Sequence, residues 1–432
     1  MKSDKNIYDV AGIGIGPFNL GLAALAEPIK NLSTIFLEQK SEFNWHDGML
    51  IPGSTLQVSY LADLVTLADP SSKFSYLNFL RSHNRLIQFG VHEQGYITRS
   101  EYNRYCRWVC GQLNNLIFGY KVNHIHYDPK QDVFIVSCYD KKADMTQTIK
   151  ARKLVVGIGS QPGLPCNSHE FLGDKVLHAA DYMYRRPEIL KSKKVVLIGS
   201  GQSAAEIFYD LLYQLDTIKT PLHWYTRSDR FYAMEHSKLN YEMTSPDYID
   251  FFYGLERDEK TRLLKNQATL YKGINHQLIN AIYDRLYSLF TEGYDKHIKI
   301  QAHAELRSVS RGEGDLYNLE FYHNAMHQKF TTDAASIILA TGYASRVPDF
   351  LGSLENIIKR NADGSLQIKR SYSLDDANRI FIQNAELHTH GFNAPDLGLG
   401  AYRNAVIINT ILGEDHYPVD FGTSFQSFGC AV

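Results

Sequence analysis

Gly12-Ile13-Gly14-Ile15-Gly16-Pro17 and Gly199-Ser200-Gly201-Gln202-Ser203-Ala204 are the two stretches that decide the fold of this chain. An apolar run enters each of them, at 7–11 and 194–198, and a helix-forming, apolar-periodic run follows each, at 20–26 and 204–212. Glycine at a strand-to-helix turn lets the backbone approach a pyrophosphate, and the N-terminus of the following helix offers unpaired N–H groups. Two such turns a domain-length apart predict one protein that binds two dinucleotides and transfers electrons between them.

The strand after each turn indicates which dinucleotide binds there. The first of these strands, at 34–38, ends in Glu38, whose carboxylate suits ribose hydroxyls and repels a 2′-phosphate, so this site suits FAD or NAD. The second, at 222–226, precedes Arg227 and Ser228, which suit a phosphate, so this site suits NADPH. That Arg227 is only a solvated surface charge stays an open alternative. The expected cofactor contacts in the two turns are Gly12, Gly14, Gly16, Pro17, Gly199, Gly201, Gln202 and Ser203.

Length and composition favour a globular protein of two or three domains, since the chain has 432 residues, 44% of them hydrophobic and 21% charged. A net charge of −2 gives no support for binding to nucleic acid or to an anionic membrane. No apolar run approaches the ~18 residues that span a bilayer. The N-terminus passes directly into the first strand without a signal peptide, and five irregularly placed cysteines argue against a disulfide framework. We therefore expect a cytoplasmic protein with no membrane span and no nucleic-acid partner.

The predicted fold class is α/β, with two Rossmann-like dinucleotide-binding domains, for FAD and NADPH, and an additional mainly helical substrate region. We assign residues 1–165 to the first part of the FAD-binding domain and 175–342 to the NADPH-binding domain. Residues 343–432 return to the FAD domain and form the C-terminal tail. Within the second domain, an aromatic-rich excursion at about 231–290 predicts extra helices that close over a substrate.

Several further segments together resemble a known family. They are Phe43 to Met49, Leu56-Gln57 with Asp63-Leu64-Val65, 70–75, 99–108 and Ala340 to Tyr343, besides the two glycine-rich turns. With these segments, the chain resembles the flavin-dependent N-hydroxylating monooxygenases of hydroxamate siderophore biosynthesis, which act on lysine, ornithine or diamines. The resemblance runs from Asp9 to about Asn409 and is strongest to the diamine branch.

The resemblance implies that NADPH reduces FAD, that the reduced flavin adds O2 to give a C4a-hydroperoxide, and that the terminal oxygen passes to a neutral primary amine. The cofactor carries the reactivity, so the protein positions the amine and excludes water. The resemblance also implies that Trp45 and His46 pack against the flavin and that Gln57, the catalytic candidate, lies near its reactive edge. Arg99 would approach the flavin from the opposite segment. Without the resemblance, His46 is better explained as a hydrogen-bonded structural histidine.

The candidate substrate residues depart from those of the amino-acid hydroxylases. In those enzymes a lysine that binds the substrate carboxylate stands where this chain has Ala62. A methyl group cannot pair with a carboxylate, so Ala62 favours a diamine, putrescine or cadaverine. The position of a carboxylate-contacting asparagine falls on Tyr241, with Asn240 one residue away. Asp69 is a candidate partner for the far ammonium, and the alternative is that it caps the next turn.

Other assignments stay open from the sequence alone. The runner-up substrates are L-lysine and L-ornithine, and a more distant alternative is another class B flavin monooxygenase. The choice between four and five carbons stays open because one methylene is worth only about 1–3 kcal/mol in an apolar pocket. His388-x-His390 lacks a Cys or acidic partner at ligand spacing, so we expect no metal. A homo-oligomer is expected, since tetramers are common among the family that the chain resembles.

Overall fold

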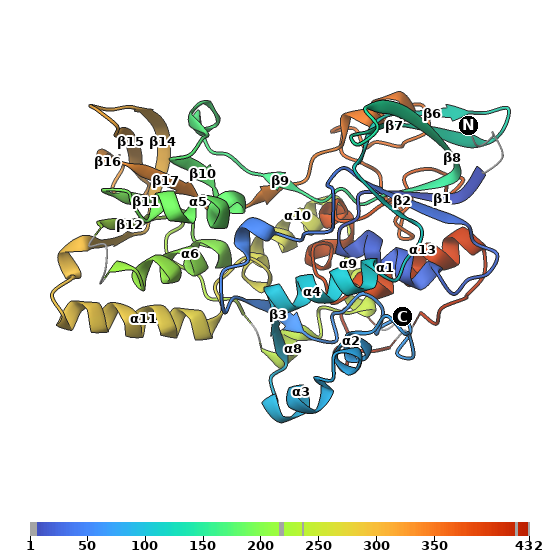
Figure 1. Cartoon of the computed structure of the whole chain (residues 1–432), viewed down its shortest axis with the longest axis horizontal. Coiled ribbons are helices and arrows are strands. Elements are labelled where there is room, and N and C mark those ends of the chain that lie inside the picture. Colours follow the sequence, from blue (N-terminus) through green and yellow to red (C-terminus); the bar gives the residue numbers. More distant parts are fainter. Residues whose placement is uncertain (1–6, 216–219, 236, 420–421, 431–432) are drawn as a thin grey trace.

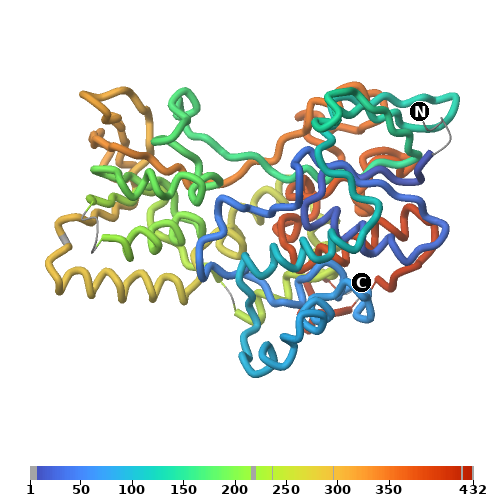
Figure 2. Tube along the Cα trace, viewed as in Figure 1, coloured from blue at the N-terminus to red at the C-terminus, as the bar shows by residue number. Residues whose placement is uncertain are grey.

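The computed structural model describes residues 7–215, 220–235, 237–419 and 422–430 of the chain. Two sheets with their helices lie side by side and form two units, as Figure 1 shows. Figure 2 follows the chain from the first unit into the second and back again. This arrangement is the α/β class that the two glycine-rich turns predict.

The first unit is built on a sheet that joins the two ends of the chain. The first strand of the chain pairs parallel with both of its neighbours. The three strands between residues 120 and 156 pair antiparallel with one another in sequence order. The strand order is β5 (Leu116–Phe118), β2 (Thr34–Glu38), β1 (Ile7–Ile13), β8 (Met145–Val156), β7 (Val133–Asp140) and β6 (Tyr120–Asp128), with β19 (Ile380–Ile382) beside β8. Residues 380–382 therefore complete a sheet that begins at residue 7.

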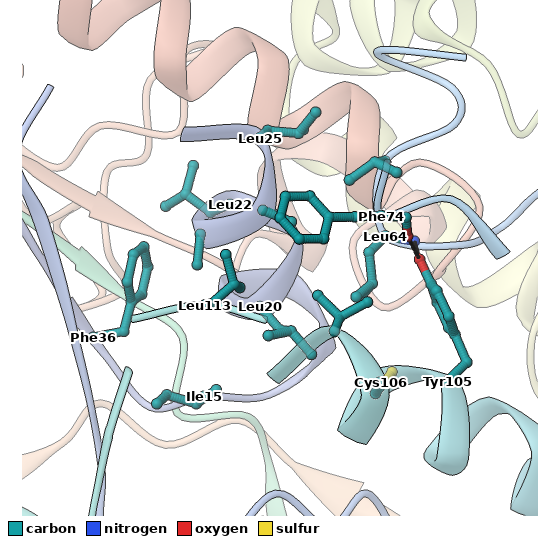
Figure 3. Packing of buried hydrophobic residues seen from close by; sticks show 14 of the residues in the cluster. Ile15, Leu20, Leu22, Leu25, Phe36, Leu64, Phe74, Tyr105, Cys106 and Leu113 are labelled. Carbon is teal, nitrogen blue, oxygen red and sulfur yellow. Dashed lines mark hydrogen bonds between the residues drawn. The ribbon is translucent and has the colours of Figure 1, made fainter. Parts of the chain in front are cut away.

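The helical layer of the first unit packs around a helix that is apolar on nearly every side. This helix, α1 (Pro17–Ala26), buries nine of its ten residues, as expected for a helix rich in leucine and alanine. Figure 3 shows Leu20, Leu22 and Leu25 of α1 packed between Phe36 of β2 and the segment around Phe74. The other helices of this layer are α2 (Tyr76–Ser82), α3 (Leu86–His92), α4 (Arg99–Cys110) and α13 (Gly400–Leu412).

The second unit is built on an all-parallel sheet that is covered on both faces. Its order is β10 (Val176–His178), β17 (Ser336–Leu339), β11 (Val195–Ile198), β12 (Leu222–Tyr225) and β13 (Ile298–Gln301). An antiparallel sheet covers one face, formed by β14 (Ala304–Arg311), β15 (Tyr317–His323) and β16 (Gln328–Ala334). The other face carries α5 (Tyr182–Ile189), α6 (Gln202–Leu212) and α11 (His276–Thr291). Burial on both faces explains why β11, in the middle of this sheet, is continuously apolar.

The excursion at 231–290 is helical, as predicted, but it divides between the two units. Its first part packs on the first unit, where the rings of Tyr248 and Phe392 lie 5.5 Å apart. Its last helix, α11, packs against α6 of the second unit. The first part consists of α8 (Lys238–Tyr241), α9 (Pro246–Gly254), α10 (Arg257–Asn266) and η4 (Ala268–Leu270).

Besides the passages into and out of this excursion, two crossings of the chain join the units. They pair with each other as β9 (Gln161–Pro162) and β18 (Tyr343–Ala344), and Gly163 N donates to Gly342 O at 2.8 Å. A further hairpin in the first unit pairs β3 (Thr55–Ser59) with β4 (Tyr96–Thr98). The remaining short elements are η1 (Asp47–Met49), η2 (Ser168–Phe171), η3 (Ala179–Asp181), η5 (Asp295–His297), η6 (Asp349–Leu354), α12 (Leu387–His390) and η7 (Gly391–Asn393).

Candidate active site

The first glycine-rich turn connects β1 to α1, and its glycines pack closely against neighbouring segments of the chain. Gly14 has a φ of +86°, and a Cβ there would lie 2.6 Å from Gly157 O. A Cβ on Gly12 would meet the Phe36 ring at 2.1 Å. Asn19 supports the turn because its Nδ2 donates to Gly14 O at 2.8 Å. Packing therefore requires glycine at both 12 and 14, and the positive φ requires it at 14 as well.

The second turn connects β11 to α6 with the same construction. Gly199 has a φ of +135°, and a Cβ there would lie 2.0 Å from Ala340 O. Gln202 uses its side chain to join two helices, since its Nε2 donates to Glu206 Oε1 at 3.0 Å and its Oε1 accepts from Asn275 N at 3.0 Å. Ser203 follows in the first turn of α6.

Both turns leave room for an anionic group in front of the helix. Gly16 and Gly201 are the N-cap residues of α1 and α6, and neither cap has a side chain that accepts the first helical N–H groups. A Cβ on either glycine would meet no atom within 4 Å. Pro17 at the first position of α1 has no N–H to satisfy. Free helical N–H groups with open space before them fit the pyrophosphate of a dinucleotide.

The residues at the tips of the next strands carry opposite charges. Glu38 at the end of β2 accepts from Ile15 N and from Lys40 N, each at 2.9 Å, which fixes the carboxylate beside the first turn. Arg227 after β12 is exposed and forms no ion pair with any other residue in the described ranges. Ser228 lies beside the second turn, with its Oγ 3.3 Å from Ser200 Oγ. This geometry fits a ribose at the first site and an additional phosphate at the second.

A buried ion pair joins the two units between these turns. Arg99 begins α4, and its Nη1 lies 2.7 Å from Glu206 Oε2 on α6. The two side chains are only 13% and 5% exposed. Glu206 also accepts from Gln202, so a single contact network reaches from α4 to the start of the second dinucleotide turn. The sequence predicted Arg99 as a cofactor contact and did not identify Glu206, although Gln202 and Glu206 are one helical turn apart.

Aromatic rings gather on the side of this ion pair that faces the crossings. The His46 ring lies 4.9 Å from Trp45 and 5.5 Å from Tyr343 of β18, in both cases edge to face. His46 adopts a left-handed backbone conformation with a φ of +49°. Neighbouring groups desolvate the His46 imidazole although part of the residue stays exposed, and together with the nearby Arg99 guanidinium they lower the pKa of His46 to about 4. The imidazole is therefore neutral at pH 7.

Gln57 lies on β3 and presents an unsatisfied donor. Its Nε2 is buried and has no hydrogen-bond partner in the described part of the chain. A buried amide N–H without a partner costs stability unless a bound group accepts its hydrogen bond. The turns, the neutral recess and this free donor together fit a flavin dinucleotide as well as a second nucleotide.

The segment after β3 places Ala62 in an apolar position beside a structural carboxylate. Ala62 is 5% exposed, and its N donates to Ser59 O at 2.9 Å. Asp63 accepts from Val65 N, Thr66 N, Thr66 Oγ1 and Tyr76 N, all within 2.9 Å. The Asp63 carboxylate thus organises this loop, and Ala62 contributes only a methyl group to its surroundings.

Tyr241 and Asn240 point to different partners. The Tyr241 hydroxyl lies 3.2 Å from that of Tyr96, and Tyr96 pairs with Ser59 across the β3–β4 hairpin. Asn240 instead donates from Nδ2 to Glu235 O at 3.3 Å within its own segment. Of these two residues, Tyr241 is therefore the one that contacts the β3–β4 hairpin, three residues before Ala62 in the chain.

Asp69 and the two histidines at 388 and 390 have structural partners. Asp69 Oδ1 accepts from Ser71 N at 3.0 Å and from Ser71 Oγ at 2.7 Å, which is the turn-capping arrangement. His390 is buried, stacks on Tyr372 at 4.4 Å and hydrogen-bonds to Arg370 O through Nε2. Within the ranges that the structure describes, no group of three or more His, Cys, Asp or Glu residues is placed to hold a metal ion. No described helix combines the length and apolarity that crossing a membrane requires.

Comparison with known proteins assigns the family. Residues 6–345 match the family model described as L-lysine 6-monooxygenase/L-ornithine 5-monooxygenase. The chain belongs to this family. It is 46% identical to a putrescine N-hydroxylase of Shewanella oneidensis over 98% of this chain and 85% of that protein.

Two solved structures have the same overall fold as this chain. One is an FAD-bound cadaverine monooxygenase of desferrioxamine biosynthesis from Erwinia amylovora, with a TM-score of 0.96 and 38% identity over 99% of this chain and 100% of that chain. The other is an ornithine N-hydroxylase from Kutzneria sp. 744 with reduced FAD, NADP+ and L-ornithine, with a TM-score of 0.87 and 26% identity over 94% of this chain and 99% of that chain. Both are flavin monooxygenases, so the predicted fold class and family are confirmed.

Proposed function

We propose that this chain hydroxylates one primary amine of an aliphatic diamine, putrescine or cadaverine, with FAD, NADPH and O2, for siderophore biosynthesis. The observation that carries the proposal is the 46% identity over nearly the whole chain to a putrescine N-hydroxylase. The buried methyl of Ala62 agrees with it, because a substrate carboxylate there would have no cation from this position.

In this proposal, each of the two turns binds a different cofactor. The first turn and Glu38 hold FAD, and the second turn holds NADPH with Arg227 and Ser228 at its 2′-phosphate. When bound, the flavin supplies the chemistry that takes a hydride from NADPH and activates O2, with one oxygen atom passing to the amine nitrogen and the other leaving as water.

The residues around the recess position the reactants and exclude water. Trp45, neutral His46 and Tyr343 form an uncharged wall, which favours the unprotonated form of an amine whose free pKa is near ~10.4. Gln57 donates from Nε2 to an acceptor at the reactive edge of the cofactor. The Arg99–Glu206 pair keeps the two units in register so that the two cofactors meet.

The product assay that tests this proposal compares putrescine, cadaverine, L-lysine and L-ornithine as substrates. We expect a hydroxylamine product and stimulated NADPH oxidation with a diamine, at a kcat/KM well above that for either amino acid. A preference for lysine or ornithine over both diamines would overturn the substrate assignment.

The variant Ala62→Lys gives a second test of the same assignment. An ammonium at this position repels a diamine and attracts a carboxylate. We therefore expect weaker diamine turnover and a gain in residual activity on lysine or ornithine. An unchanged substrate ratio in Ala62→Lys would remove Ala62 from the substrate site.

The proposed setting is the cytoplasm, and the proposed assembly is a homo-oligomer. All five cysteines are free thiols, which agrees with a reducing compartment. Large apolar side chains stand exposed on α3 and α11, among them Ile87 at 82% and Tyr283 at 70% exposed. Light scattering coupled to size-exclusion chromatography measures the assembly, and a strictly monomeric mass would contradict it.

A further inference from the structure

The carboxyl ends of three neighbouring strands in the second unit form one row. Ile198 at the end of β11 lies beside Tyr225 at the end of β12, and Tyr225 lies beside Gln301 at the end of β13. Ligands of parallel α/β sheets bind outside these carboxyl ends. Neighbouring strands are about 4.8 Å apart, so β13 ends about 10 Å from the dinucleotide turn that follows β11. The residues after β13 therefore come next in the row to those after β12.

Direct contacts connect the second dinucleotide turn with the segment after β13. Ser200 of the turn has its Oγ 3.3 Å from Ser228 Oγ. The backbone O of Ser228 accepts from His303 N at 2.8 Å. Asn324 joins the same segments, since its Nδ2 donates to Arg227 O at 3.2 Å and its N donates to His303 O at 2.9 Å. His303 thus lies directly beside the two residues proposed for the 2′-phosphate of NADPH.

The His303 ring is held in place and keeps its nitrogens open to a ligand. It stacks on His323 of β15, with the ring centroids 5.4 Å apart and an angle of 27° between the planes. His323 is itself fixed, because its Nδ1 accepts from Met326 N at 3.1 Å. Both histidines are half-buried, and neither ring nitrogen of His303 hydrogen-bonds to another residue in the described ranges. At least one of these nitrogens carries an N–H that can donate to a phosphate.

The backbone at His303 does not by itself explain the imidazole. Its φ of +58° lies in the left-handed region, which glycine adopts more readily than histidine. The turn needs only a residue that tolerates this conformation, so a ring is not required for the fold of the turn. Residues held in sparsely populated conformations cluster at ligand sites. A role for the His303 ring in binding accounts for its presence here.

The charged residues after β12 favour an anion. Arg227 and Arg230 form no ion pair with any residue that the structure describes, and the Arg230 guanidinium lies 4.6 Å from the centre of the Tyr232 ring. The acid between them, Asp229, accepts from the Tyr232 hydroxyl at 2.6 Å. The segment 227–230 therefore carries a net positive charge beside His303, which suits a phosphate.

We propose that His303 donates a hydrogen bond to the 2′-phosphate of NADPH and completes the site of this phosphate with Arg227 and Ser228. The inference rests on the proposed function, in which the second turn holds NADPH. It adds a residue after a third strand to the selection of NADPH over NADH, since NADH has a hydroxyl in place of this phosphate. The stacked His323 ring holds the His303 ring at the edge of the site.

The test measures nucleotide binding to the FAD-loaded enzyme by calorimetry, without turnover. His303→Gly removes the ring and suits the positive φ, whereas His303→Asn also tolerates this conformation and keeps an N–H donor. We expect His303→Gly to raise the Kd for NADP+ and for adenosine 2′,5′-bisphosphate by about 10-fold. The Kd values for NAD+ and AMP should change little, because these nucleotides have no 2′-phosphate. His303→Asn should retain part of the affinity for NADP+.

His327→Gln is the matched control in the same hairpin. The Nδ1 of His327 lies 3.2 Å from the Tyr322 hydroxyl, and Tyr322 and His323 face opposite sides of their sheet because they are consecutive in β15. This control should keep the wild-type ratio of the Kd values for NAD+ and NADP+. Bound FAD should be unchanged in His303→Gly. If this variant does not retain FAD, His303→Asn serves instead and should lower the same ratio by a smaller factor.

The outcomes distinguish this inference from the proposed function. If the wild-type enzyme binds NADP+ no more tightly than NAD+, the NADPH site of the proposed function fails together with the inference. If the wild type prefers NADP+ and His303→Gly leaves the ratio of the two Kd values unchanged, only the role of His303 is overturned. An equal rise of both Kd values in His303→Gly has the same meaning, since it shows a loss that does not depend on the 2′-phosphate.

Discussion

The two dinucleotide turns are nearly the same in backbone and differ in the residue that stands beside them. Gly16 and Gly201 both cap their helices with extended backbone and open space before them. Beside the first turn, Glu38 is fixed by two backbone N–H groups, whereas beside the second Arg227 is exposed without an ion pair in the described ranges. In the proposed function, the turn therefore provides a general pyrophosphate site, and the charge at the tip of the next strand selects the nucleotide.

The largest expected effect tests which glycines are required by the packing of the protein and which leave space for the ligand. Gly199→Ala should destabilise the protein by about 3–5 kcal/mol, since its Cβ would lie 2.0 Å from Ala340 O at a positive φ. Gly201→Ala meets no protein atom within 4 Å, so it should keep the melting temperature and raise the KM for NADPH instead. Calorimetry and NADPH kinetics measure the two effects. Equal melting temperatures for both variants would contradict the distinction.

The next effect concerns the contact between the units. Glu206→Ala leaves Arg99 buried and unpaired, which should cost about 3 kcal/mol and weaken retention of FAD as well as use of NADPH. Asp210→Ala is the matched control, because Asp210 pairs with Arg186 at 2.7 Å inside the second unit. This control should lower stability without loss of FAD. FAD loss of equal size in both variants would show that the Arg99–Glu206 pair has no special role between the units.

A smaller effect tests the opposite charges directly. Arg227→Ala should raise the KM for NADPH by about 10- to 100-fold, with little change for NADH and none in bound FAD. Glu38→Gln should weaken FAD binding and leave the NADPH-to-NADH preference intact. Steady-state kinetics with NADPH and NADH and titration with FAD measure these effects in the two variants. An equal rise of both nicotinamide KM values in Arg227→Ala would remove Arg227 from the 2′-phosphate site.

The smallest effect concerns the response of the first unit to acid at a single buried histidine. Burial lowers the pKa of His390 in the first unit from 6.5 to about 3, against the opposing effect of its hydrogen bond to the Arg370 carbonyl. Between these values the unfolded chain binds a proton that the folded chain does not, so stability falls as the pH drops. The expected loss is about 1.4 kcal/mol per pH unit, beginning near pH 6.5.

Unfolding followed by release of FAD, measured from pH 7 to pH 5, checks this dependence. His390→Gln has no titrating ring and should reduce the slope by about 1.4 kcal/mol per pH unit, whereas His46 and His223, whose pKa values are also lowered to about 4, keep their contributions. The variant also lowers stability at every pH. An unchanged slope in His390→Gln would assign the acid sensitivity entirely to other groups.

The predictable part of the site is the part built from residues close together in sequence. The two turns, α1, β2 and the position of Glu38 follow from apolar runs, glycines and a spacing that the local backbone imposes, and the structure has them at 12–38 and 195–212. The roles of Trp45, Gln57 and Ala62 came from resemblance to the family, and their contacts with cofactor and substrate remain proposals. Asp69, a candidate for the far ammonium, caps a turn in the structure.

The sequence by itself determined that this chain forms two dinucleotide-binding turns, that they carry opposite charges, and that it belongs among the N-hydroxylating monooxygenases. Only the tertiary structure decided which distant side chains meet. Arg99 and Glu206 are 107 residues apart, and the Tyr96 and Tyr241 hydroxyls that meet belong to residues 145 apart. Such pairs carry no local periodicity, because tertiary packing, and not the backbone between the residues, brings them together.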